Sequence, residues 1–395
     1  AHCRRDADHR LSDSTRFPTT RGESPYLAVS ESQRLEYRHH PQWIAQHPGR
    51  ATHVSSKSHR RSYKLALLAG LTVGLTSCVA DAPLDSLDPQ GPAARQIDNL
   101  SNPVFLIAGI ILAIVLGGML FAIVRYRDRG QAEPKQIHGN AALEVVWTAI
   151  PIILLAGLAV PTVQTIFDLT ECSDDAMEVD VIGHQWWFEY QYPEEGITTA
   201  NVMVIPAGQE VCLNMTSDDV LHNFWIPKLN GKRYLVPGQQ TTLILEADAP
   251  GEYWGQCGEF CGLSHALMRA RVRAVDQADY DAWVARMNQP AAPPDGALAQ
   301  AGLDEFNGIC STCHVIEGVN KLDNPIGPDL THFADPYRNV FAGASLDRTD
   351  EHLADWLADP PTIKPGSFMP DLNLTADEID SLVAYLQGLD PTKEN

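Results

Sequence analysis

One short segment of the sequence groups four side chains that bind metals. Within twelve residues it places two thiols, an imidazole and a thioether, in the order Cys257, Cys261, His265 and Met268. His222 lies upstream, at the end of a segment with strand character. Soft sulfur ligands combined with imidazole favour copper, zinc or an iron–sulfur cluster. A structural zinc site takes four Cys or His ligands and no methionine, whereas methionine weakly completes copper sites.

The number of ligands indicates two copper ions rather than one. A single copper would not use two cysteines, two histidines and one methionine, but two coppers bridged by two thiolates would. The alternative is a Cys257–Cys261 disulfide with an incidental histidine nearby, and a buried cysteine or methionine taken alone is usually a core residue. We expect the dinuclear copper site because the whole set of ligands occurs together.

A second grouping lies near the C-terminus, in Cys310-Ser-Thr-Cys313-His314. Cys-x-x-Cys-His is the attachment signature of c-type haem, in which both thiols bond to the haem and the histidine ligates the iron. A predicted helix over residues 301–308 precedes it. The later Ser367-Phe-Met369-Pro370 completes a resemblance to class I cytochromes c, which implies Met369 as the sixth ligand. A His/Met pair raises the haem potential. The alternatives are a zinc knuckle and a core role for Met369.

Two apolar segments predict a membrane anchor. Residues 103–124 and 145–167 contain no charged side chain, and each is long enough to cross ~30 Å of hydrocarbon at ~1.5 Å per residue. Basic residues gather in the loop between them, whereas the preceding flank has only Arg95. The positive-inside rule therefore places the loop in the cytoplasm and everything after residue 168 outside. The alternative is a pair of buried core helices. The loop's basic residues are Arg125, Arg127, Arg129 and Lys135.

The charge of the chain is divided between a basic leader and an acidic remainder. The net charge is −21, yet residues 1–77 hold 12 Lys/Arg against 6 Asp/Glu, and residues 78–395 hold 17 against 44. Such acidity argues against a nucleic-acid partner. A basic stretch, an apolar run over residues 65–76 and then Cys78 form the layout of a secretory signal. Leu75-Thr-Ser-Cys78 resembles a lipoprotein cleavage box, which implies lipid on Cys78. A short buried helix is the alternative.

The position of the first methionine, Met119, also bears on the leader. A start at a GTG codon, read here as Val54, would explain a chain that begins with alanine. We therefore expect residues 1–53 to be upstream sequence.

The remaining segments predict a β domain followed by a helical one. Alternating residues over 178–182, 202–205, 210–215 and 241–246 indicate a Greek-key sandwich or barrel. Thr375 with Glu378 forms a capping-box start for a last helix to Leu389. Cys172 and Cys212 fall on the exported side, where disulfides persist, and both a bridge and two buried thiols are open. The expected division is 1–77 leader, 78–168 N-terminal segment and hairpin (with a Pro/Asp linker over 79–98), 169–287 copper domain, 288–297 linker and 298–395 haem domain.

The copper segment, with His222 in Ser217-Asp-Asp-Val-Leu-His222-Asn-Phe-Trp, resembles the dinuclear copper A site of cytochrome c oxidase subunit II. The resemblance implies that Cys257 and Cys261 bridge both coppers and that His222 and His265 cap one copper each. It further implies Met268 and the Glu259 backbone carbonyl as weak axial ligands, with the Glu259 carboxylate reaching a magnesium shared with subunit I.

The resemblance extends over residues 95–287. Gly183-His-Gln-Trp186-Trp resembles the family's aromatic stretch, which implies that Trp186, an exposed aromatic, passes electrons to copper. Leu143-Glu144-Val-Val-Trp likewise implies that Glu144 stands at the mouth of a proton channel into subunit I. A core role for Trp186 and a helix-dipole role for Glu144 are the alternatives. Tyr234 and Gln239 depart from the family, which often has Asp and Arg there, so the contact with subunit I at that point is in doubt.

These features together predict a multidomain membrane protein. Its parts are a two-helix transmembrane hairpin, a cupredoxin-like Greek-key β domain and an all-α class I cytochrome c domain. The resemblance is to a caa-type subunit II in the bacterial inner membrane, with its copper and haem domains on the periplasmic or extracellular side. It implies electron transfer from cytochrome c, or from a quinol–cytochrome c reductase, through haem c and copper A to subunit I for the reduction of oxygen to water coupled to proton pumping. Subunit III is implied as a further partner.

Four other classes of protein share some of these features. Three of the seven histidines after residue 77 are already assigned. The four that remain are too few to bind an oxygen-reducing centre in this chain as well. A copper A subunit of a nitric oxide reductase would carry the same electron-input parts, and a free-standing membrane-anchored electron carrier is a rival of another class. Quinol oxidase subunits resemble the copper domain but lack its copper ligands, and nitrous oxide reductase needs a propeller domain for which there is no room.

Overall fold

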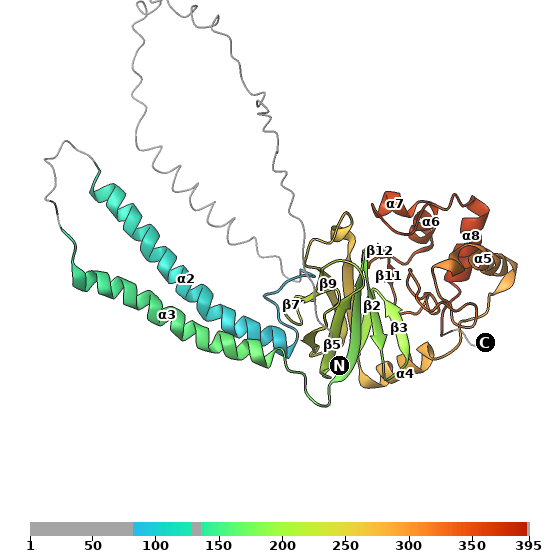
Figure 1. Ribbon diagram of the computed structural model, residues 1–395, viewed down its shortest axis with the longest axis horizontal. Coiled ribbons are helices and arrows are strands. Elements are labelled where there is room, and N and C mark those ends of the chain that lie inside the picture. Colours follow the sequence, from blue (N-terminus) through green and yellow to red (C-terminus); the bar gives the residue numbers. More distant parts are fainter. Residues whose placement is uncertain (1–81, 128–135, 137, 393–395) are drawn as a thin grey trace, which may run out of the picture. The chain divides into compact units, whose positions relative to one another are not determined.

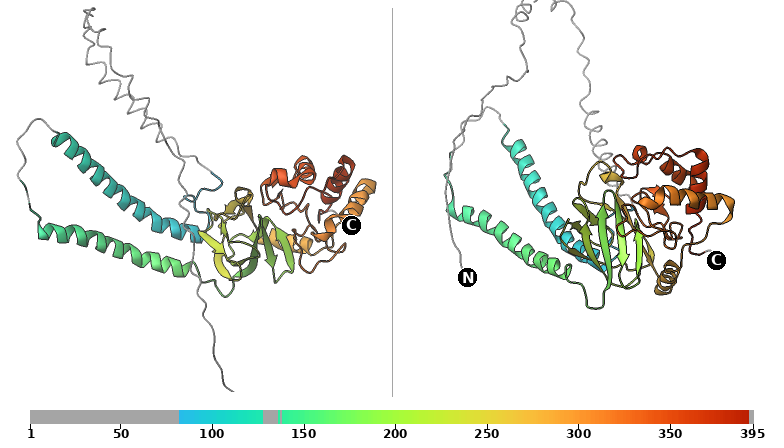
Figure 2. Two further views of the ribbon diagram at one scale, coloured as in Figure 1. Left: turned by 45° about the horizontal axis from the view of Figure 1, so that its top comes forward. Right: turned by 45° about the vertical axis from the view of Figure 1, so that its right-hand side comes forward.

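Two long helices form the N-terminal part of the computed structural model, which describes residues 82–127, 136 and 138–392. They are α2 (Pro92–Arg125) and α3 (Ala141–Asp168), neighbours in every view (Figure 1, Figure 2). Both are long and apolar enough to cross a membrane, and their apolar windows are unburied within the chain. Water would not tolerate so much exposed apolar surface, but lipid does. The two predicted spans are therefore confirmed, while the leader, Cys78, Arg129 and Lys135 lie outside the described residues.

The segment before the first span differs from the loose linker that we expected over residues 79–98. Helix α2 begins at Pro92, in the first turn, where a proline's missing N–H costs nothing. Its first turns are fastened to the β domain, because Arg95 forms an ion pair with Asp248. The Lys228 Nζ likewise lies 2.7 Å from the Asp88 carboxylate. Composition alone suggested a linker because proline and aspartate are also typical of loops.

The middle of the chain is a sandwich of two five-stranded sheets (Figure 1). The sheet orders are β3-β2-β1-β5-β8 and β4-β10-β9-β6-β7, and the β1–β5 and β4–β10 pairs are parallel. Non-consecutive neighbours of this kind confirm the Greek-key prediction. The strands are β1 (Met177–His184), β2 (Trp187–Tyr192), β3 (Ile197–Ala200), β4 (Val202–Pro206), β5 (Val211–Ser217), β6 (His222–Trp225), β7 (Lys232–Leu235), β8 (Thr241–Leu245), β9 (Gly251–Cys257) and β10 (Arg269–Val275), with the short helices η2 (His265–Leu267) and α4 (Gln277–Met287).

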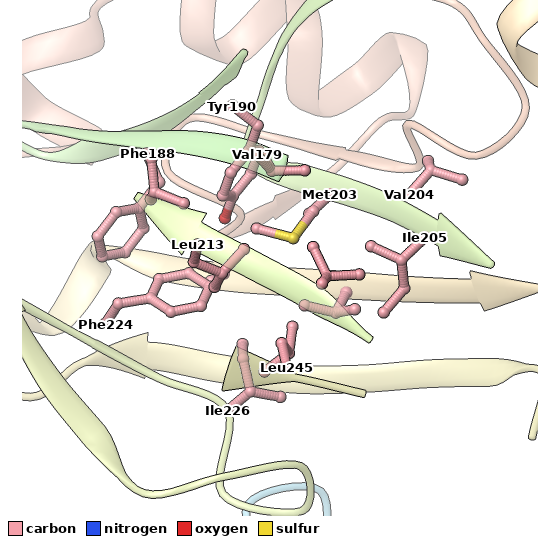
Figure 3. Packing of buried hydrophobic residues seen from close by; sticks show 14 of the residues in the cluster. Val179, Phe188, Tyr190, Met203, Val204, Ile205, Leu213, Phe224, Ile226 and Leu245 are labelled. Atoms are coloured by element: carbon pink, nitrogen blue, oxygen red, sulfur yellow. The ribbon is translucent and has the colours of Figure 1, made fainter. Parts of the chain in front are cut away.

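The alternation of side chains along these strands fills the space between the sheets. Figure 3 shows Phe188 and Tyr190 of β2 pointing toward Phe224 of β6, and the Phe188 and Phe224 rings meet edge to face at 5.2 Å. All three side chains are fully buried. Tyr192 is also buried, and its hydroxyl is satisfied by both the N–H and the carbonyl of Val204. A closely packed core of this kind holds the loops at the sheet ends in fixed positions.

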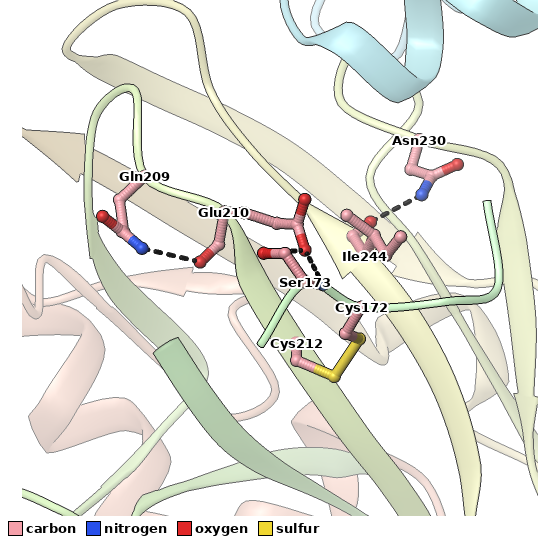
Figure 4. Close-up of a disulfide and its surroundings, with 7 residues drawn as sticks. All are labelled: Cys172, Ser173, Gln209, Glu210, Cys212, Asn230 and Ile244. Atoms are coloured by element: carbon pink, nitrogen blue, oxygen red, sulfur yellow. Dashed lines mark hydrogen bonds between the residues drawn. A yellow bond between two sulfur atoms is a disulfide. The ribbon is translucent and has the colours of Figure 1, made fainter. Parts of the chain in front are cut away.

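A disulfide between Cys172 and Cys212 joins the segment after α3 to strand β5 (Figure 4). Beside it, the Glu210 carboxylate accepts hydrogen bonds from the Ser173 N–H at 2.7 Å and from its hydroxyl at 2.9 Å. The chain that leaves the second membrane helix is therefore fastened to the sandwich at once. Of the two possibilities that the sequence left open for these cysteines, the structure has the bridge.

The C-terminal part is a small helical domain wrapped around its own apolar core. Helix α5 lies against helix α8, close enough that a Cβ added at Gly302 would collide with the backbone of Ser381. Thr375 and Glu378 form the predicted capping box at the start of α8. A two-stranded ribbon, β11–β12, accompanies the helices. The elements are α5 (Gly296–Gly308), η3 (Cys310–Thr312), β11 (Val340–Phe341), β12 (Leu346–Asp347), α6 (Asp350–Ala358), α7 (Pro360–Ile363) and α8 (Ala376–Leu386).

Loss of the Cys172–Cys212 bridge should destabilise the sandwich. The bridge closes a loop with a sequence separation of 40, and closing a loop of this length is worth about 2–4 kcal/mol because it restricts the unfolded chain. We expect the double substitution Cys172→Ser and Cys212→Ser to lower the free energy of unfolding by that amount, measured by denaturant titration of tryptophan fluorescence. The control is Ser173→Ala, which removes only a hydroxyl beside the bridge. Equal stability of the double variant and the parent would contradict the prediction.

Candidate metal centre

The predicted copper ligands converge at one end of the sandwich. Cys257 ends β9, and the pairing of β9 with β6 brings His222, the first residue of β6, beside it. Ligand atoms of His222, Cys257 and Cys261 all lie within 4.8 Å of one another, and among the described residues this is the only such group of three or more His, Cys, Asp or Glu. The two sulfurs are 3.8 Å apart. His222 was far away in sequence, and the strand pairing explains how it joins the others.

The remaining two predicted ligands come from the loop between β9 and β10. The His265 Nδ1 lies 3.7 Å from the Cys261 sulfur, and the Met268 sulfur lies 3.8 Å from the same atom. The Glu259 carbonyl oxygen lies 3.2 Å from the Cys257 sulfur. The four other predicted donors, from His222, Glu259, His265 and Met268, therefore lie around the thiols of Cys257 and Cys261.

The donor set fits a soft metal pair. His222, Cys257, Cys261 and Met268 are buried, and the His222 Nδ1 has no hydrogen-bond partner within the described part of the chain. A buried polar atom left unpaired is costly unless a ligand is meant to meet it. The hydrogen bond with Cys261 lowers the pKa of the Cys257 thiol to about 3, and the same contact raises the pKa of Cys261. The Cys257 thiol is therefore the more acidic of the two, and both thiols give up their protons when metal binds.

Asp219 orients one of the ligands, and the sequence argument missed it. Its carboxylate lies 2.7 Å from the His222 Nε2 and also accepts the Gln185 N–H at 2.6 Å. With Nε2 engaged, the Nδ1 is directed at the thiols. A carboxylate behind a ligating histidine commonly fixes its ring and strengthens its hold on the metal. The signal was present in the sequence, as an acid three residues before a candidate ligand.

Trp186 is buried, which corrects the expectation of an exposed aromatic. Only 5% of it is accessible, because the C-terminal domain covers it. Its indole N–H donates to the Cys261 carbonyl at 3.0 Å. On the other side its ring is stacked on Phe368, with centroids 6.4 Å apart and planes 9° from parallel. The indole therefore lies between a copper-binding cysteine and the residue next to Met369.

The haem signature borders a cavity of about 340 Å³ in the C-terminal domain. Cys310, Cys313, His314 and Met369 all line it, among mostly apolar neighbours. The His314 Nδ1 is hydrogen-bonded to the Pro328 carbonyl at 2.9 Å, which leaves the other ring nitrogen for a metal. Burial lowers the pKa of His314 and favours the neutral imidazole that ligates iron. Two thiols, an imidazole and a thioether around one apolar cavity fit a covalently attached haem.

Gly327 shows how closely this cavity is built around its histidine. A Cβ at Gly327 would collide with the His314 ring, so the turn Gly327-Pro-Asp-Leu330 packs directly against the imidazole. Trp186 also lines the cavity, although it belongs to the β domain. The copper ligands and the haem cavity are thus connected through one side chain.

Two further predictions concern the carboxylates of Glu144 and Glu259. Glu144 is exposed in the first turn of α3, whose N-cap Asn140 accepts the Leu143 N–H. The Glu259 carboxylate is hydrogen-bonded to the hydroxyl of Tyr234, which raises the Tyr234 pKa. Tyr234 is the position at which the family often has Asp, so the departure falls on a direct neighbour of the carboxylate assigned to magnesium.

Comparison with known proteins agrees with this architecture. Three family matches cover the three parts of the chain: cytochrome c oxidase subunit II, transmembrane domain, at residues 85–165; cytochrome c oxidase subunit II, periplasmic domain, at 194–275; and cytochrome c at 299–390. The cytochrome c oxidase subunit 2 of Alkalihalophilus pseudofirmus is 40% identical over 334 residues, which are 82% of this chain and 95% of that protein. The subunit of the same name from Bacillus sp. PS3 is 37% identical over 275 residues, 65% of this chain and 76% of that protein.

Other similar proteins cover less of the chain. The quinol oxidase subunit 2 of Bacillus anthracis is 35% identical over 237 residues, 58% of this chain and 81% of that protein. A crystal structure of the periplasmic domain of subunit II of cytochrome oxidase from Bradyrhizobium japonicum is 26% identical and covers 30% of this chain and 96% of that structure, with a TM-score of 0.29.

The fold and the donor sets define a class: a two-pass membrane protein whose cupredoxin-like and cytochrome c domains lie on one side and carry electrons. Within that class the chain belongs to the cytochrome c oxidase subunit 2 family. It is therefore a subunit of an oxidoreductase, a haem–copper terminal oxidase, and carries a C-terminal cytochrome c domain. The family implies copper A and haem c as its cofactors, and subunit I as a partner.

Removing one copper ligand should empty the copper site and leave the haem in place. We expect His222→Ala or Cys261→Ser to abolish the near-infrared absorption of copper A and to stop turnover, because a thiolate-bridged pair does not form with a ligand missing. The covalent haem spectrum should be unchanged. His352→Ala is the matched control, since that side chain lies away from the site in the C-terminal domain. A retained near-infrared band would refute the ligand assignment.

Asp219→Ala should weaken copper binding without abolishing it. The substitution frees the His222 ring to turn, and loss of such a supporting carboxylate typically costs ~10–100-fold in metal affinity. The measurement is a competition titration of copper against a chelator, followed by the near-infrared band. Asp218→Ala is the matched control, because that neighbouring carboxylate is largely exposed. Unchanged affinity in Asp219→Ala would contradict the supporting role.

Proposed function

We propose that this chain is the electron-input subunit of an oxygen-reducing, proton-pumping oxidase. Electrons come from cytochrome c or from a quinol–cytochrome c reductase and pass through the C-terminal domain and Trp186 to the copper ligands, and then to subunit I. The observation that carries the proposal is the position of Trp186, hydrogen-bonded to Cys261 and stacked on Phe368. Haem c and copper A, when bound, each take up and release single electrons.

The residues of the chain supply attachment, orientation and exclusion of water. Cys310 and Cys313 would hold the haem covalently, while His314 and Met369 would approach its iron from the cavity that they border. Burial of the copper ligands keeps water away from the thiolates, so little solvent has to reorganise when charge changes there. The Cys261 carbonyl, which accepts the Trp186 N–H, links the indole to a copper ligand by one hydrogen bond.

We also propose roles for Glu144, Glu259 and Cys78, a further partner subunit, and a side of the membrane for the two cofactor domains. Glu144 would take up protons at the mouth of a channel into subunit I, and the Glu259 carboxylate would reach a magnesium shared with that subunit. Cys78 would carry the lipid, and subunit III would complete the complex. We place the copper and haem domains outside the bacterial inner membrane, a side that suits the Cys172–Cys212 bridge because disulfides persist there.

Purification in mild detergent with identification of the partners tests the whole proposal. We expect a haem a-containing subunit I to copurify, and the complex to consume oxygen when reduced cytochrome c is supplied. The same preparation is assayed with nitric oxide as acceptor. Uptake of nitric oxide without uptake of oxygen would favour the nitric oxide reductase alternative, and a chain that purifies alone would favour a free-standing carrier.

A further inference from the structure

Lys364 is a buried lysine at the junction of the copper and haem domains. Only 4% of it is accessible. Its Nζ donates to the Trp186 carbonyl at 2.6 Å and to the Ala342 carbonyl at 2.8 Å. One acceptor belongs to the β domain and the other to the C-terminal domain, so a single amino group is bonded to both. No ion pair joins it to a carboxylate within the described part of the chain.

Burial of a lysine in this position is unfavourable in free energy. Taking an ammonium out of water without a carboxylate partner carries a large desolvation cost, and burial lowers the pKa of Lys364 to about 7. Simple packing would be served better by an apolar side chain of similar length. The buried Trp186 carbonyl, however, would lose the Lys364 donor if that replacement were made, whereas the Ala342 carbonyl would keep the Ser345 hydroxyl. An unpaired buried polar group is itself costly.

The rest of this loop also fits closely around Trp186. A Cβ at Gly366 would press against the indole ring, and a Cβ at Gly343 would collide with the Trp186 carbonyl and the Lys364 Nζ. Phe368 stacks on the ring itself. Residues 364–368 therefore touch the tryptophan on its backbone and on its ring.

Two further hydrogen bonds cross the same junction. The Ser264 hydroxyl donates to the Pro365 carbonyl at 2.7 Å, and the Arg269 N–H donates to the Gly343 carbonyl at 2.8 Å. Ser264 lies within the loop that carries the predicted copper ligands, and Arg269 directly follows its last ligand, Met268. Both acceptors adjoin Lys364 or its partner Ala342. The contacts form one continuous interface with Lys364 at its centre.

We propose that Lys364 is a positioning residue that clamps Trp186 between the haem cavity and the copper ligands, and thereby sets the rate of electron transfer between the two domains. The inference rests on the proposed function. In each transfer the haem iron is oxidised by one electron and the copper pair is reduced by one, and no bond of Trp186 or Lys364 forms or breaks. Lys364 acts through the tryptophan that it holds.

The test compares Lys364→Met with Lys364→Arg in the purified complex. The haem is reduced by a photochemical flash, and transfer to copper is followed in the near-infrared band. We expect Lys364→Met to slow this internal transfer at least ~10-fold, on the order of what lost positioning costs in reaction rates. Lys364→Arg keeps the N–H donors and should restore most of the rate. Lys321→Met, at an exposed lysine of the same domain, is the control for loss of charge.

Two further readouts separate positioning from general damage. Reduction of the haem by an external donor should be unchanged in Lys364→Met, because Lys364 is buried and forms no part of the surface that an external donor meets. In the copper-free full chain, hydrogen exchange at the Arg269 amide should become faster in Lys364→Met and stay slow in Lys364→Arg. Exchange does not depend on a working oxidase, so it reports the interface directly.

The outcomes distinguish the inference from the function on which it rests. Internal transfer at the parent rate in Lys364→Met, with both centres loaded, overturns the clamp and leaves the proposed function intact. Absence of any transfer from haem to copper in the parent overturns the proposed function instead. If Lys364→Met does not yield a loaded complex, Lys364→Leu, which also lacks a hydrogen-bond donor, is assayed in the same way, and transfer at the parent rate in that variant equally overturns the clamp.

Discussion

The backbone carbonyl of Cys261 connects the predicted copper ligands to the residues that border the haem cavity. It accepts hydrogen bonds from the Gln185 side chain at 2.6 Å and from the Trp186 indole at 3.0 Å. The sulfur of the same residue lies among the copper ligands. Without these two hydrogen bonds, the loop between β9 and β10 would be free to adopt other conformations. Here it is attached to the β1–β2 connection, which also carries the aromatic side chain facing the haem cavity.

The sandwich provides the rigidity that this arrangement requires. His222 stands on a strand, and its partner Asp219 precedes that strand in a loop that also bonds to Gln185. Sites supported by regular elements and by a second layer of hydrogen bonds keep their geometry better than sites on isolated loops. Because His222 and Gln185 share Asp219 as a hydrogen-bond partner, a shift in the Gln185–Trp186 segment would disturb the ligand histidine.

Much of the site could be predicted because its chemistry is concentrated in short sequences. Cys257, Cys261, His265 and Met268 are near neighbours in the chain, and so are Cys310, Cys313 and His314, so spacing alone indicated the kind of ligand. The membrane spans and the capping box of α8 follow from local patterns in the same way. His222 could be named as a candidate from its residue type and strand context, but its approach to Cys257 depends on pairing between strands β6 and β9.

Apart from Asp219, the features that escaped prediction depend on contacts between distant segments. Trp186 was expected to be exposed, since nothing in its own sequence shows that residues 364–368 cover it. Lys364 precedes a Pro-Gly pair and reads as an ordinary surface lysine. The start of α2 at Pro92 depends on partners such as Asp248, more than a hundred residues away. Periodicity and composition carry no information about such pairings.

The burial of Trp186 has a consequence for where an electron donor would bind on the proposed path. Because the C-terminal domain covers the indole, an external donor would meet that domain before it could reach Trp186. Large apolar residues that line the haem cavity and are also exposed are Ile326 and Phe368, 64% and 65% accessible. On the proposed path, the choice of donor is therefore a property of the C-terminal domain and is separate from the copper ligands.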